Sequence, residues 1–154
     1  GLNEFDSDDL IACAHPQFKN KAVLGAWLLT QDNKRKAFQQ LFETAVTRWT
    51  SGEHDADYIE SWSAFQSRVQ NALRDVIQQA NGKDVVIFTS GGPITVIAQQ
   101  CLELSNDKAF AMNWTLLNAG ITQLLYSRSG KMSLASFNEH QHLAAAGQSF
   151  LTYR

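Results

Sequence analysis

The sequence predicts an α/β domain in which helices cover both faces of a parallel or mixed sheet. The run Val85–Phe88 is short, unbroken and apolar, which is typical of a strand that is buried on both faces. Segments with helical spacing come before and after it, and two β-like runs near the carboxyl end are joined by the hairpin signal "SRSG". This order of helices, strand, helix and hairpin predicts a three-layer α/β/α sandwich.

Length and composition exclude several classes of protein. A chain of 154 residues with 44% hydrophobic and 18% charged residues is expected to form one domain over residues 1–154. The net charge of -2 leaves no excess of cations for nucleic acid. No apolar run is long enough to span a membrane, and Cys13 and Cys101 lack the spacing of a redox or metal pair. We expect reduced thiols and a cytoplasmic protein.

The segments before the long helix are predicted from their periodicity. Residues 1–16 have none that is sustained, so a loop or one short helix is expected. A helix is predicted over Phe18–Leu29, and an amphipathic helix over Asn33–Trp49. The acidic stretch "TSGEHDADY" that follows predicts a loop.

A long helix is predicted from Glu60 onward. Ser63 and Gln66 have the spacing of a capping box, and Asn81 and Gly82 are typical of a helix end. The aromatic and aliphatic residues of this helix and of the one before it are expected to face the core. They include Phe38, Phe42, Trp49, Trp62, Phe65, Val69 and Leu73.

The strand Val85–Thr89 is expected to turn directly into a helix. Gly91 and Gly92 permit a tight turn, and Pro93 suits the first helical position. Residues 105–107 are predicted to cap a further short helix. Because a covered strand usually has neighbours on both sides and only three strands are evident, at least one strand is missing from the chain.

The turn after the strand is the best candidate for a binding site. Backbone N–H groups of Ser90, Gly91 and Gly92 at a helix start form a natural anion site. From the residues alone, a turn selected only for its backbone geometry is the favoured interpretation, and contact with phosphate is favoured only by the family resemblance described below. A serine-hydrolase elbow is disfavoured, because Phe88 stands where that motif requires its first glycine.

The four histidines give no metal site. His140 and His142 in "HQH" have the spacing of two ligands, but no third ligand accompanies them. We expect them to bond to backbone near the end of the sheet. His15 and His54 are expected at the surface.

Five segments resemble the histidine phosphatase superfamily, which is also called phosphoglycerate mutase-like. Together they extend over residues 2–143, in the order in which that family has them. The segments are "LNEF", "ESWSAFQSRV", "VVIFTSGGPI", "LLNAGIT" and "SFNEHQHL".

Two departures from the family pattern shape what the resemblance implies. The Arg-His-Gly motif that carries the family's nucleophile on the first strand does not occur, and Ser90 stands where the family has its second histidine. The resemblance therefore implies the carboxyl-terminal part of a phosphoglycerate mutase-like domain that lacks its first strand. It also implies that Glu4 is a catalytic acid and that Ser90, Gly91 and Gly92 bind the phosphate group.

The function that the resemblance implies is hydrolysis of a phosphate monoester in the parent protein, without metal or cofactor. Its partner would be a phosphorylated small molecule, and the chain alone is expected to be inactive. A non-catalytic protein that binds a phosphorylated ligand is the alternative, followed by an interaction module without ligand. Arg68 and Glu60 either frame the site or pair at the surface. Uncovered strand edges are expected to permit homo-oligomers.

Overall fold

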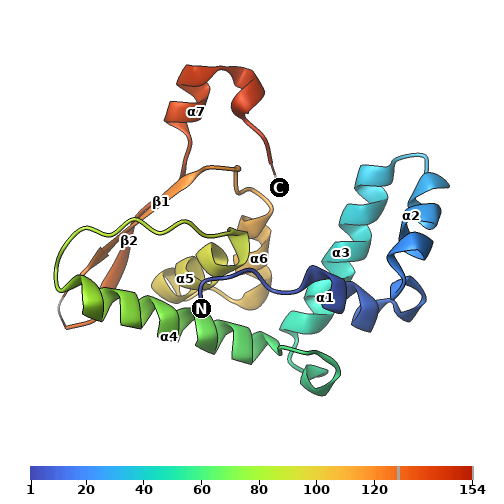
Figure 1. The fold of residues 1–154 in the computed structure, drawn as a ribbon, viewed down its shortest axis with the longest axis horizontal. Coiled ribbons are helices and arrows are strands. Elements are labelled where there is room, and N and C mark those ends of the chain that lie inside the picture. Colours follow the sequence, from blue (N-terminus) through green and yellow to red (C-terminus); the bar gives the residue numbers. More distant parts are fainter. Residues whose placement is uncertain (128, 154) are drawn as a thin grey trace. The chain divides into compact units, whose positions relative to one another are not determined.

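The computed structural model describes residues 1–127 and 129–153 (Figure 1). The chain divides into two compact units, which we describe separately. The helical unit is Phe5–Phe65, and the mixed unit combines Gly1–Glu4 with Gln66–Arg154. The described residues contain seven α-helices and one two-stranded sheet, so the protein is of the mixed α/β class. The prediction of a single domain stays a prediction.

Three helices build most of the helical unit, and the predicted periodicities are confirmed. Residues 1–16 contain one short helix, α1 (Ser7–Ala14), and α2 (Lys21–Leu29) and α3 (Lys34–Thr50) follow. Each begins after a side chain that accepts backbone N–H bonds, as is typical of helix starts. These capping residues are Asp6, Asn20 and Asn33.

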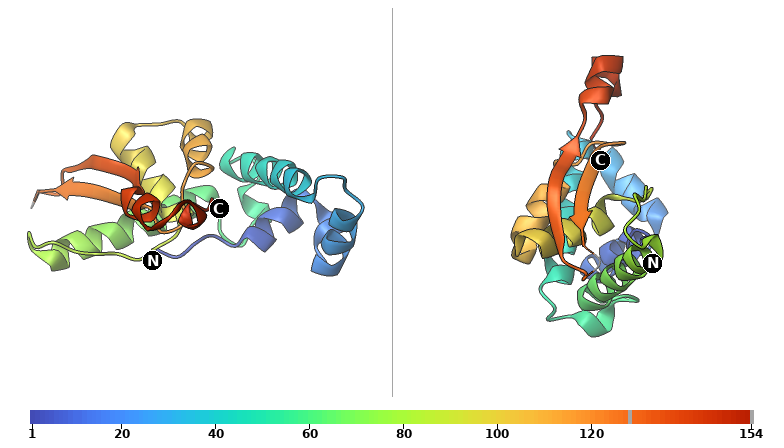
Figure 2. Two further views of the ribbon diagram at one scale, coloured as in Figure 1. Left: turned by 90° about the horizontal axis from the view of Figure 1, so that it is seen from above. Right: turned by 90° about the vertical axis from the view of Figure 1, so that its left-hand side faces the viewer.

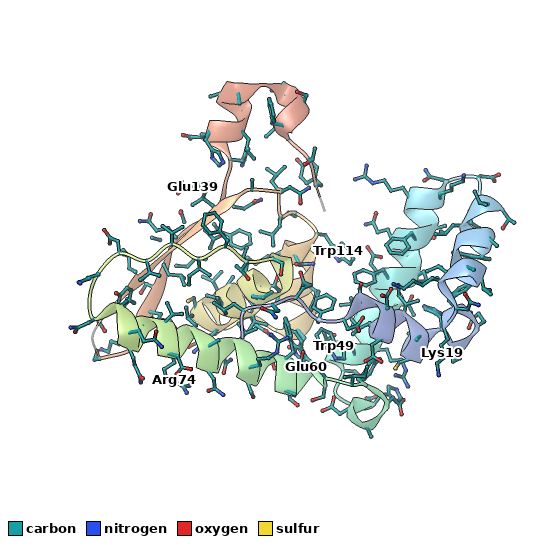
Figure 3. The ribbon with its side chains drawn as sticks, viewed as in Figure 1. Lys19, Trp49, Glu60, Arg74, Trp114 and Glu139 are labelled. Carbon is teal, nitrogen blue, oxygen red and sulfur yellow. The ribbon has the colours of Figure 1, made fainter. Side chains whose placement is uncertain are left out.

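An aromatic cluster forms the core of the helical unit. Trp49 and Phe65 are fully buried, and Trp49 lies with its ring centre 4.9 Å from Phe5 and 5.0 Å from Trp62. The indole N–H of Trp49 donates to the carbonyl of Glu60 at 2.8 Å (Figure 3). Trp49 and Phe65 are therefore core residues, as predicted, and the polar group of Trp49 has its partner. The prediction that Phe38 faces the core is wrong, because this side chain is exposed on α3.

The mixed unit combines helices with an antiparallel hairpin. It holds most of α4 (Trp62–Ala80), α5 (Gly91–Leu102), α6 (Asn106–Asn113) and α7 (Gln141–Ala146). The predicted hairpin is confirmed as β1 (Ile121–Tyr126) and β2 (Met132–Glu139), which run side by side in Figure 2. Leu124 pairs with Leu134 and Tyr126 with Met132, and the register shifts between Ile121 and Leu124.

Helix ends differ from the prediction in two places. The hydroxyl of Ser61, not of Ser63, accepts the first-turn N–H of α4, that of Ala64, at 3.2 Å. Pro93 is the third residue of α5 instead of the first. The predicted end of α4 is confirmed by the left-handed backbone at Asn81, with φ 48°.

The predicted strand Val85–Thr89 is wrong as a strand of the sheet. These residues are exposed and lie outside the β1–β2 sheet, in the stretch that joins α4 to α5 (Figure 1). The sequence has the composition of a strand, but a strand needs a hydrogen-bonded neighbour. Neither β1 nor β2 pairs with it. In the described part of the chain, the sheet of the expected three-layer sandwich therefore consists of one hairpin.

Candidate functional site

The first turn of α5 presents the predicted Ser-Gly-Gly sequence. Ser90 is the N-cap in extended backbone (φ -118°, ψ 177°), and Gly91 and Gly92 are the first two helical residues. Gly92 and Pro93 are buried, whereas Ser90 is half-buried. The Ser90 hydroxyl makes no capping bond to its own helix. It therefore stays available as a hydrogen-bond donor beside the positive end of the helix dipole.

Glu4 lies against this helix start, although 88 residues separate it from Gly92 in the chain. Its carboxylate accepts the Gly92 N–H with one oxygen at 3.1 Å and the other at 3.3 Å. A carboxylate is the kind of group that a helix N-terminus stabilises. The structure thus brings together all four residues that the sequence proposed for the site.

Hydrogen bonds hold the three residues that precede Glu4. The Arg68 guanidinium donates from Nη1 to the carbonyls of Gly1 at 2.7 Å and Asn3 at 3.2 Å. The Thr89 hydroxyl donates to the carbonyl of Leu2 at 2.7 Å. These bonds position the backbone that carries Glu4. The two roles predicted for Arg68 and Glu60, framing of the site or pairing at the surface, stay predictions.

A buried polar network fixes α5 below the site. Thr95 donates to the side-chain carbonyl of Asn113 at 3.0 Å, and both residues are buried. Gln99 donates to the Asn106 side chain at 2.8 Å and accepts from Gln66 at 3.0 Å. These residues were missed from the sequence. The available signal was the presence of Thr95 and Gln99 in a largely apolar helix, because buried polar groups require partners.

Three of the four histidines lie within hydrogen-bond distance of backbone carbonyls, as predicted for His140 and His142. His140 Nδ1 lies 3.0 Å from the carbonyl of Asn138, and His142 Nε2 lies 3.1 Å from that of Ala119. The prediction that His15 lies at the surface is wrong, because this residue is half-buried and its Nε2 lies 3.1 Å from the carbonyl of Leu41. Over residues 1–127 and 129–153 we find no cluster of three or more histidine, cysteine or acidic residues that could hold a metal ion.

A hollow of about 610 Å³ lies elsewhere on the mixed unit. Its walls come from α4, from α5 and from the hairpin, and they carry amides such as Gln70, Gln78 and Gln100. They also include Arg74, which is labelled on α4 in Figure 3. None of the predicted site residues lines it. The hollow and the α5 start are therefore separate features, and the chemistry proposed from the sequence belongs to the second.

The arrangement at the α5 start can bind an anion but contains no evident nucleophile. Its donors are the Ser90 hydroxyl and the Gly91 N–H, since the Gly92 N–H donates to Glu4, and such donors suit phosphoryl oxygens. The Glu4 carboxylate can carry a proton to an oxygen bound there. Within the described part of the chain, no imidazole is hydrogen-bonded to Ser90, Gly91 or Gly92.

Comparison with known proteins identifies one family. The model of the histidine phosphatase superfamily (branch 1) matches residues 24–140, which is more than half of the chain. No curated protein and no solved structure matches the chain. No helix in the described part of the chain is long and apolar enough to cross a membrane.

Proposed function

Because the chain belongs to the histidine phosphatase superfamily, we propose that it is the carboxyl-terminal part of a phosphatase that cleaves a phosphate monoester through a phosphohistidine. The observation that carries this proposal is the contact between the Glu4 carboxylate and the Gly92 N–H. It joins an acid to an anion-binding helix start. A monoester phosphatase needs both.

Each site residue has a defined part in the proposed reaction. The Ser90 hydroxyl and the Gly91 N–H hold oxygens of the phosphoryl group, while the Gly92 N–H positions the Glu4 carboxyl beside it. A neutral histidine attacks phosphorus, the bond to the ester oxygen breaks, and Glu4 protonates the leaving alcohol. Water then attacks the phosphohistidine with Glu4 as base, which releases phosphate and restores the imidazole.

The nucleophile in this proposal comes from an Arg-His-Gly strand outside residues 1–154. The exposed segment Val85–Thr89, which leads into Ser90, supports this, because it has strand composition and pairs with neither β1 nor β2. Serine at position 90 supplies a neutral donor in place of a cationic one. We expect this to weaken transition-state stabilisation by a few kcal/mol.

The experiment is to read the source gene upstream of the Gly1 codon and to express the complete reading frame. Hydrolysis of 4-nitrophenyl phosphate by the complete protein, and none by residues 1–154, is expected. Glu4→Gln should lower kcat much more than it raises KM, since the acid acts on the leaving group. Turnover by residues 1–154 that is lost in Ser90→Ala would contradict the proposal and indicate a serine nucleophile.

A second candidate is a protein that binds a phosphorylated ligand without turnover. The observation that favours it is the neutral donor Ser90 at the start of α5, where no imidazole of residues 1–127 and 129–153 is hydrogen-bonded to the turn. Calorimetry with inorganic phosphate separates the two. Binding by a complete protein that hydrolyses no ester would support this candidate, and measurable turnover would exclude it.

A further inference from the structure

One side of α2 packs against the core of the helical unit. Leu24 and Trp27 pack against the buried cluster that contains Phe18, and the ring centre of Trp27 lies 5.0 Å from that of Phe18. Residues 22–29, with the sequence AVLGAWLL, contain no charged side chain. The side of α2 that faces away from this core is therefore apolar as well, which is unusual for a helix in contact with water.

The outward side of α2 forms an apolar stripe. Its members follow helical spacing and are all exposed, with Val23 at 46% and Leu29 at 71%. We call this stripe the α2 face, and it consists of Ala22, Val23, Ala26 and Leu29. Apolar residues that gather on one exposed face mark a contact surface, whereas scattered single ones do not.

Basic side chains stand at both ends of the α2 face. Lys19, which is labelled in Figure 3, and Lys21 are at its start. Three more open α3, after the short loop that follows α2 in Figure 1, and they are Lys34, Arg35 and Lys36. All five are exposed, and of these five only Lys21 forms an ion pair with a residue that the structure describes. Residues 19–36 thus contain five basic residues and one acidic residue, a net charge of +4, in a chain whose net charge is -2.

The stability of the fold does not explain these charges. Three of them occupy the first turn of α3, where the helix dipole favours acidic residues and disfavours cations. The first turns of α2 and α3 contain no acidic residue. Cations that weaken a helix start and have no role in its packing indicate contact with something anionic outside the fold.

We propose that the α2 face and the five basic residues at its ends dock the protein on the surface of an anionic lipid bilayer. The apolar side chains enter the boundary between headgroups and acyl chains, and the basic side chains reach the phosphate and carboxylate groups of the lipids. An apolar stripe with flanking cations fits a bilayer better than it fits nucleic acid. A nucleic acid would use the cations but not Val23 and Leu29.

A second copy and the protein's own chain are weaker candidates for this surface. Both ends of the α2 face are basic, so a symmetric contact of two such faces would bring like charges together in either direction. The strand proposed from outside residues 1–154 pairs with residues 85–89 of the mixed unit, so it leaves α2 of the helical unit without an assigned neighbour. The inference does not rest on the proposed phosphatase reaction.

Cosedimentation of the protein from its complete reading frame with lipid vesicles tests the proposal. With vesicles of phosphatidylcholine and about 30% phosphatidylserine, we expect half-maximal binding at about 0.1–1 mM lipid, the range of a single weak anchor. Binding should fall at least tenfold on pure phosphatidylcholine or in about 0.5 M salt, because the cations then lack partners or are screened. Amide hydrogen exchange of residues 22–29 should slow when vesicles are added.

Two sets of substitutions separate the apolar contribution from the charged one. Val23→Gln with Leu29→Gln should weaken binding at least fivefold, because less apolar area is buried in the bilayer. Lys34→Gln with Arg35→Gln and Lys36→Gln should weaken it at least tenfold. Because all five side chains are exposed, circular dichroism should show an unchanged fold.

Each set has a matched control. Ile59→Gln removes an apolar side chain that is 84% exposed in the same unit. Lys83→Gln with Lys108→Gln and Lys131→Gln removes three exposed cations of the mixed unit. Both controls should bind vesicles within about twofold of the unmodified protein, because screening confines the electrostatic attraction to charges near the membrane.

Several results would overturn the proposal. Vesicle binding by residues 1–154 that the complete protein lacks would mean that the protein's own chain covers α2, and the absence of binding by both would exclude a membrane contact. Equal losses in the variants and their controls would place the contact outside α2. Binding to RNA that only the triple variant at residues 34–36 abolishes, or a dimer without lipid that the glutamine pair at residues 23 and 29 dissociates, would assign the surface to those partners instead.

Discussion

Replacement of Glu4 by alanine is expected to destabilise the mixed unit. The variant leaves the N–H of buried Gly92 without its carboxylate, which costs about 1–3 kcal/mol. The favourable interaction of the charge with the helix start, about 0.3–1 kcal/mol, is lost as well. Since both N···O distances exceed those of a strong charge-assisted bond, we expect about 1–2 kcal/mol in total. This corresponds to a fall in Tm of about 3–6 °C.

Glu4→Gln separates the hydrogen bond from the charge. Glutamine keeps an oxygen acceptor for Gly92 but loses the negative charge, so about 0.3–1 kcal/mol should be lost. Urea and thermal unfolding, followed by circular dichroism, measure both variants, with exposed Glu53→Ala as the control. If alanine and glutamine at position 4 leave the free energy of unfolding unchanged, Glu4 does not bond to the α5 start and the site as described is wrong.

Three further predictions follow from burial and charge. Phe65→Ala should lower the free energy of unfolding of the helical unit by about 3–5 kcal/mol in urea, since Phe65 is fully buried among aromatic rings, and a loss below about 1 kcal/mol would contradict that packing. The hydrogen bond from Arg48 lowers the pKa of Asp57 below its ordinary 3.8. The stabilisation of the fold by this bond is therefore present above pH 3.8 and is lost as the pH falls through the lower pKa of folded Asp57. Asp57→Asn should accordingly reduce Tm at neutral pH and leave it unchanged in strong acid. Burial raises the pKa of the Cys101 thiol, so iodoacetamide should alkylate it more slowly in the folded chain than in urea at mildly alkaline pH, and equal rates would refute its burial.

Local patterns in the sequence predicted most of the helices and the hairpin. The helical spacing of Leu41, Ala45 and Trp49 is sufficient for α3, because a single amphipathic face determines the helix and what it buries. The β-like runs around "SRSG" likewise contain both strands of their pair. Where the hydrogen-bond partners of an element lie within its own segment, the sequence of that segment is sufficient to predict the element.

The segment Val85–Thr89 could not be predicted in this way. Its composition is that of a buried strand, but strand formation depends on a neighbour that its own residues do not encode. The structure leaves it outside the sheet and exposed. The same limit applies to Pro93, whose position in α5 depends on where the turn from this segment ends.

The site was predictable only in part. The residue types of Ser90, Gly91 and Gly92 indicate a helix start, whereas Glu4 was proposed only through the family resemblance. No local pattern relates it to a glycine 88 residues away. Arg68 and Gln99 act through long-range bonds to backbone and amide groups, for which a single sequence carries no spacing rule.

The measurement that tests the phosphatase proposal most directly is trapping of the phosphoenzyme in the protein made from its complete gene. After brief reaction with a labelled phosphate monoester and quenching in alkali, we predict label on the histidine of an Arg-His-Gly motif upstream of Gly1. The label should be stable in alkali, lost in acid and retained in Ser90→Ala. A complete reading frame without that motif, or label on Ser90, would contradict the proposal.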